Sequence, residues 1–65
     1  MTADEKMAKL EAAINLINEA DVLMQAALGA DDEVYYIHTQ LENAADDIQA
    51  TVDTLRALRM QNIIA

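Results

Sequence analysis

Few side chains in this 65-residue sequence could do chemistry. There is no Cys and no Ser, and the single glycine, Gly29, rules out a Gly-rich phosphate loop. The only histidine, His38, lies one helical turn before Glu42, a spacing that could hold a metal ion, but no Glu-x-x-His motif supports a bundle-type di-metal site. We therefore expect no enzyme activity, no metal and no cofactor. His38 is interpreted as a packing residue at the core boundary; a pH-sensitive or ligand-binding role is the alternative.

Acidic residues in the second half of the sequence repeat at helical spacing. Because they recur at steps of three, four or seven residues, one stripe on the outside of a helix holds Tyr35, Glu42, Asp46, Gln49 and Asp53. Tyr36 projects to another exposed side. A charged outer face can simply be solvated, but Tyr is enriched at binding hot spots. We interpret the stripe as a contact surface for a protein partner with a basic surface, such as a DNA-binding regulator.

The charge balance is strongly acidic, with 12 Asp and Glu against 4 Lys and Arg and a net charge of −8. Such a charge disfavours phosphate binding and favours basic proteins, although it can also serve solubility alone. The first residues show no basic segment followed by an apolar run, and charges interrupt every apolar stretch. We therefore expect a soluble cytoplasmic protein with no signal peptide, no membrane contact and no direct nucleic-acid binding.

The elements that position these residues are two helices in a single domain, residues 1–65. A capping box, Thr2 with Glu5, begins a helix over about 3–28. Gly29 suits the left-handed end of that helix, and Asp31 suits the N-cap of a second helix over about 32–63. A turn over 29–31 is so short that the helices must be antiparallel neighbours. The predicted fold is an all-α antiparallel hairpin.

The second helix carries a heptad pattern. One heptad position holds Val34, Leu41, Ile48 and Leu55. Its partner position holds Ile37, Ala44, Thr51 and Leu58, and Ala45 and Val52 widen the seam on one flank.

The first helix has more apolar surface than one neighbouring helix can cover. Its first stripe is Met7, Leu10, Ile14, Ile17, Met24 and Leu28; its second is Ala13, Leu16, Ala20, Leu23 and Ala27. At about 100° per residue the two stripes span an arc of roughly 200°. We therefore predict a homodimeric four-helix bundle, parallel or antiparallel. The predicted dimer core is Met7, Leu10, Ile14, Leu16, Ile17, Leu23, Met24, Val34, Ile37, Leu41, Ile48 and Leu55.

Two features interrupt this pattern. Asp21 falls within the first stripe, where one polar core residue can fix register or oligomeric state, or act as a buried binding acid. The second helix is also expected to outrun the first by roughly 12 Å, at about 1.5 Å per residue. This overhang holds Leu58, Arg59, Met60, Ile63 and Ile64. It could close over a dimer partner, bind another molecule or fray.

The hairpin resembles the Rop (repressor-of-primer) family. The matching residues are Met1-Thr2, Glu5-Lys6, Ala30-Asp31, Ile37, Leu41, Ala45 and Asp46. The resemblance implies a homodimer of helical hairpins that binds paired RNA loops through the first helices. The family's RNA-reading positions align with Ala3, Leu10, Ile14, Asn18 and Gln25, where only the two amides are chemically compatible. In type, the chain is also similar to small acidic phage proteins that inhibit host regulators.

The sequence leads to one main functional hypothesis. It is a small acidic regulator that dimerises and inhibits a protein partner. The predicted partner-binding residues are Tyr35, Tyr36, Glu42, Asp46, Asp53, Met60, Ile63 and Ile64. A Rop-like RNA-binding regulator and a structural dimerisation module are the alternatives.

Overall fold

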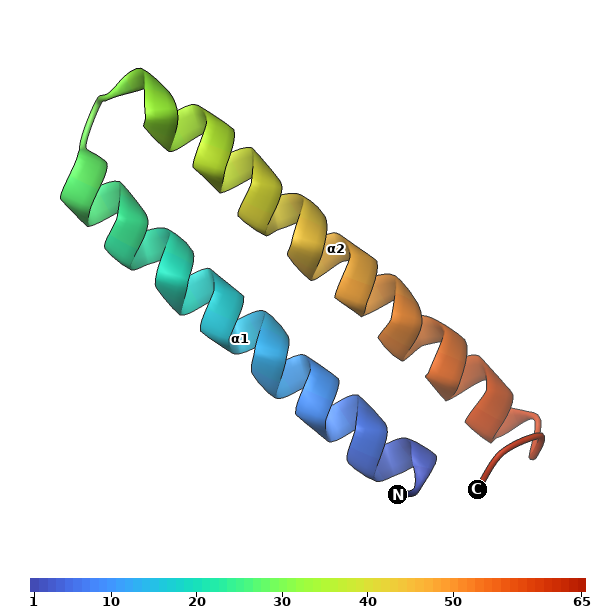
Figure 1. Cartoon of the computed structure of the whole chain (residues 1–65). Helices are drawn as coiled ribbons and strands as arrows, with labels where there is room; N and C mark the ends of the chain where they lie inside the picture. The colour runs from blue at the N-terminus through green and yellow to red at the C-terminus, as the bar shows by residue number, and fades with distance from the viewer.

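The computed structural model describes residues 1–65 as two antiparallel helices joined by one turn (Figure 1). Helix α1 spans Ala3–Leu28 and α2 spans Asp32–Met60. The predicted all-helical hairpin is confirmed. Its Cα atoms occupy 48 × 15 × 12 Å, so the hairpin is a rod about three times as long as it is wide. Neither helix has the length and hydropathy required to cross a membrane.

A threonine cap starts α1. The Glu5 backbone N–H donates to Thr2 Oγ1 over 3.2 Å, which satisfies one of the unpaired N–H groups of the first turn. The Thr2 hydroxyl in turn donates to the Glu5 carboxylate, also over 3.2 Å. The carboxylate thus meets the Thr2 side chain, whereas a full capping box would pair it with the Thr2 backbone N–H. Asp4 and Glu5 also lie where the helix dipole favours negative charge.

The turn depends on one residue with a positive φ, whose ψ of −119° lies outside the left-handed helical region expected for Gly29. Gly29 has φ +61°, and its N–H donates to the Gln25 carbonyl over 2.9 Å. Asp31 occupies the N-cap position of α2 in an extended conformation, but its side chain makes no capping hydrogen bond. The acidic first turn of α2, Asp32 and Glu33, is favoured by the helix dipole. A glycine is required here because other residues rarely adopt this φ.

The end of α2 differs from the expectation of a helix to about residue 63. The helix ends at Met60 because Asn62 adopts φ +59°. The Asn62 N–H donates to the Arg59 carbonyl and the Ile63 N–H to the Leu58 carbonyl, which is a Schellman motif.

Beyond this motif the chain turns back toward the N-terminus of α1 (Figure 1). The Ala65 carbonyl accepts a hydrogen bond from the Ala3 N–H over 2.6 Å, and Ile64 is half-buried. The expected overhang past α1 is therefore wrong for the last residues. They close the open end of the hairpin and leave Met60 and Ile63 exposed.

The hairpin alone buries little. Only Ala3 and Val52 are fully buried, and the remaining seam residues are half-buried. Val52 lies in the seam, whereas Thr51 and Ala44 of the expected partner row are exposed. In the middle of α2 the flanking row of Ala45 and Val52 therefore forms the second row of the seam, whereas Ile37 and Leu58 of the expected row are half-buried like Ala45. The two rows are one residue apart, and this choice leaves the Thr51 hydroxyl at the surface, where it donates to the Asp47 carbonyl.

The two sides of the hairpin that each expose both helices differ in chemistry. Leu16 and Leu23 are 65% and 71% exposed. Lys6 of α1 and Thr51 of α2 line one groove and therefore lie on the same side of the hairpin. Residues seven positions apart share one side of each helix, so the rest of this side follows from these two. This side, called the apolar face, consists of Ala13, Leu16, Ala20, Leu23 and Ala27 of α1 with Ile37, Ala44, Thr51 and Leu58 of α2.

Candidate functional site

The opposite side of the hairpin is polar and contains a groove between the helices. On this side an ion pair joins Glu11 of α1 to Arg56 of α2, and residues at seven-residue spacing from these two share the side. This polar face consists of Glu11, Asn18 and Gln25 of α1 with Tyr35, Glu42, Gln49 and Arg56 of α2. The groove has a volume of about 250 Å³.

The groove has both apolar and polar lining residues. The apolar ones are Ile14, Ile17, Leu41 and Ala45. The polar ones are Asn18, Asp21, His38, Glu42, Asp46 and Gln49. An aliphatic stem can lie against the apolar side chains while a charged head group meets the exposed carboxylates of Glu42 and Asp46, as Lys and Arg side chains do. The site therefore suits a basic side chain.

A contact between the helices fixes one end of the groove. His38 Nδ1 lies 2.7 Å from Asp21 Oδ2, and Gln25 Nε2 donates to the same oxygen over 3.0 Å. The Asp21 side chain is 19% exposed and the His38 side chain 41%. The other carboxylate oxygen, Asp21 Oδ1, is buried without a hydrogen-bond partner. Asp21 therefore has a partner across the hairpin seam, and His38 does more than pack at its boundary.

His38 also reaches a second carboxylate. Its Nε2 lies 3.3 Å from Glu42 Oε2, on the edge of the ring opposite to the Asp21 contact. Both nitrogens can donate only when the imidazole is protonated. The two carboxylates do not converge, and no group of three or more His, Asp and Glu side chains could hold a metal ion. The chemistry of this cluster is hydrogen bonding and charge pairing.

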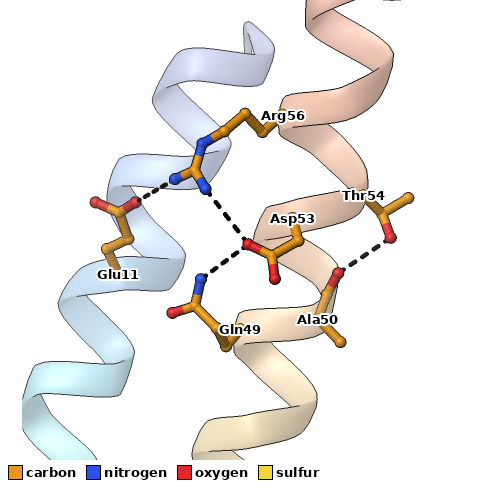
Figure 2. A network of polar contacts seen from close by, with 6 residues as sticks. All are labelled: Glu11, Gln49, Ala50, Asp53, Thr54 and Arg56. Carbon is orange, nitrogen blue, oxygen red and sulfur yellow. Dashed lines mark hydrogen bonds and ion pairs between the residues drawn. The ribbon is translucent and has the colours of Figure 1, made fainter.

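A second polar network occupies the other end of the polar face (Figure 2). Arg56 contacts Glu11 of α1 and Asp53 of α2, each over 3.3 Å. Gln49 Nε2 donates to Asp53 over 3.1 Å. Asp53 is therefore paired within the chain. Asp46, by contrast, makes none of the chain's ion pairs or side-chain hydrogen bonds.

The structure separates the predicted partner-binding residues into groups. Glu42 and Asp46 line the groove, and Tyr35, 77% exposed, lies on the same face one heptad from Glu42. Tyr36, Met60 and Ile63 are also exposed but lie outside the groove.

The sequence did not predict that Asn18, Asp21 and His38 line the same groove as Glu42 and Asp46 of the acidic stripe. Asp21 and His38 were individually conspicuous, one as a polar residue in an apolar stripe and the other as the only histidine. No local signal in the sequence indicated that they meet.

The chain was compared with protein-family models, with curated proteins and with solved structures, and no match was found.

Proposed function

We propose that this chain is a small non-enzymatic regulator that dimerises as a four-helix bundle and inhibits a protein partner with a basic surface. The observation that carries the proposal is the groove on the polar face. It is lined by the exposed Glu42 and by Asp46, and the Asp46 carboxylate forms no ion pair or hydrogen bond within the chain. A basic side chain of the partner occupies this groove, and Tyr35 contacts the partner beside it. This mode of action is of the kind used by small phage-encoded inhibitors of host regulators.

The apolar and polar faces lie on opposite sides of the hairpin, which supports dimerisation through the first and partner binding through the second. A chain of this length rarely has enough core to be stable alone, and only two of its 65 residues are fully buried. Dimerisation covers the exposed Leu16 and Leu23 on the apolar face. The polar face, with its groove, then stays accessible to the partner.

RNA binding of the Rop type has less support. Asn18 and Gln25 do lie on the polar face, but Gln25 is bonded to Asp21. The same face holds the carboxylates of Glu11, Asp21 and Glu42, which repel phosphate. A purely structural dimerisation module would leave the unpaired acid of the groove without a role.

The test is capture of a partner by matched charge variants. The tagged protein, Asp46→Asn and Asp47→Asn are used as bait in a host lysate, and captured proteins are identified by mass spectrometry. The two variants lose the same charge at adjacent exposed positions, but only Asp46 lines the groove. We expect a basic protein that the parent and Asp47→Asn retain and Asp46→Asn loses.

The salt dependence of that capture adds a second criterion. Association steered by charge slows as salt rises, so the deficit of Asp46→Asn should shrink between low and high salt. Equal capture by all three baits would contradict the groove as the binding site. Capture of RNA in place of protein, with the steep salt dependence of phosphate binding, would favour the alternative function.

A further inference from the structure

We infer that the apolar face docks against the same face of a second copy, with the two hairpins antiparallel. The inference deepens the dimer included in the proposed function: it names the interface and its orientation. It does not depend on which partner the polar face binds.

The size of the hairpin limits what can cover this face. The face extends over 48 by 15 Å between Cα atoms, roughly 700 Å². A stable interface buries about 800 Å² on each partner, so an occupant has to cover nearly the whole length and width of the face. A second copy has these dimensions.

The side chains on the face suit close packing of α1 against its own copy. Ala13, Ala20 and Ala27 form a row of small residues at seven-residue spacing, and Leu16 and Leu23 stand beside that row. Small residues let helix backbones approach, and larger ones fill the layers between them. Residues 13 and 20 lie on either side of the midpoint of α1 (Ala3–Leu28). An antiparallel arrangement therefore sets Ala13 opposite the second copy's Ala20.

Charge decides between the two orientations. The half of the hairpin near the turn, residues 16–45, holds six carboxylates and no Lys or Arg, a formal charge of −6. The open half, residues 1–15 and 46–65, holds six carboxylates and all four basic residues, a charge of −2. A parallel dimer sets −6 beside −6. An antiparallel dimer sets each −6 half beside a −2 half and lowers the repulsion.

Two of the four basic residues of the open half lie at the interface itself. Lys6 and Lys9 line a groove of about 390 Å³ between the helices, together with Leu10, Thr51 and Leu55. Glu33 lies one turn before Ile37 at the other end of the same face. In the antiparallel dimer the lysines of one copy lie at the level of Glu33 of the other. Such rim pairs contribute orientation more than affinity.

The test uses the absence of native cysteine. Three chains with single substitutions, Ala13→Cys, Ala20→Cys and Ala44→Cys, are purified, mixed in pairs and oxidised mildly. The antiparallel dimer brings residue 13 near residue 20 of the second copy. A face-to-face parallel dimer instead sets α1 over α2 of the second copy, so residue 20 lies near residue 44. Each mixture therefore reports one orientation.

A disulfide needs Cα atoms within about 7 Å, so we expect the 13–20 mixture to form at least about fivefold more mixed covalent dimer than the 20–44 mixture. Residue 26 is an exposed position of α1 outside the apolar face, and Ala26→Cys measures random oxidation. A dominant 20–44 product overturns the orientation. Yields at the Ala26→Cys level in both mixtures, or a monomer by light scattering, overturn the interface. Either result leaves the groove assay on the polar face unaffected.

Discussion

Asp21→Leu should stabilise the protein, although it breaks the shortest side-chain contact between the two helices. The substitution removes the contact with His38, which is 41% exposed, and the exposed hydrogen bond from Gln25. Contacts exposed to this degree are worth about 1 kcal/mol or less each, so their joint loss is about 1.5 kcal/mol. His38 and Gln25 can then bond to water.

Two gains outweigh this loss. Asp21 Oδ1 is buried without a partner, and removal of such a group returns about 1–3 kcal/mol. The new leucine would be about as buried as Asp21, whose side chain is 19% exposed, and burial of most of a leucine side chain contributes about 1.5 kcal/mol. The net expectation is a gain of about 2 kcal/mol, and a chain of this size gains roughly 4–8 °C in Tm per kcal/mol.

The assay is urea and thermal unfolding at one fixed protein concentration, because dimerisation makes stability depend on concentration. Asp21→Asn is the matched control: it keeps the shape but removes the charge, and adds no apolar surface, so it should lose about 1 kcal/mol. A loss of more than 1 kcal/mol for Asp21→Leu would refute the reasoning. It would mean that the contact with His38 is worth more than its exposure implies.

Four further outcomes are expected. Thr2→Ala should lower the free energy of unfolding by about 1 kcal/mol through loss of the α1 cap, seen in urea unfolding. Gly29→Ala should cost about 1–3 kcal/mol in the same assay, because φ is +61° although no atom lies within 4 Å of the added Cβ; an unchanged stability would mean that the turn rearranges. Tyr35→Ala should keep its helicity by circular dichroism but bind the captured partner roughly thirtyfold more weakly, a loss of about 2 kcal/mol, and equal binding would remove Tyr35 from the site. Leu23→Glu should be monomeric by light scattering at micromolar concentration, whereas Val22→Glu, at an equally exposed position outside the apolar face, should remain dimeric.

The helices and their connection could be predicted from the sequence because their signals are local. The cap at Thr2, the glycine in the turn and the apolar repeat each act within a few residues. The end of α2 was predicted too late because Ile63 and Ile64 continue the apolar pattern. Asn is also a weaker stop signal than Gly, so the left-handed conformation of Asn62 was not anticipated.

The contents of the groove could not be predicted, because they depend on how one helix is rotated and shifted against the other. The rows of Ala44 with Thr51 and of Ala45 with Val52 differ by one residue, about 100° around the helix. The burial of Val52 settles this rotation. The same rotation brings His38 to Asp21, a pair separated by 17 residues in the sequence.

The cross-hairpin contacts also imply an order of folding. The contact between Asp21 and His38 closes a segment of 17 residues and that between Glu11 and Arg56 one of 45. The hydrogen bond from Ala3 to Ala65 closes nearly the whole chain. Chain-closure entropy grows with the logarithm of segment length, so the widest contact costs about 1 kcal/mol more to form directly than the narrowest. Contacts between α1 and α2 should therefore form first beside Gly29 and last at the termini. Backbone amide hydrogens near the termini should exchange with solvent before those near the turn.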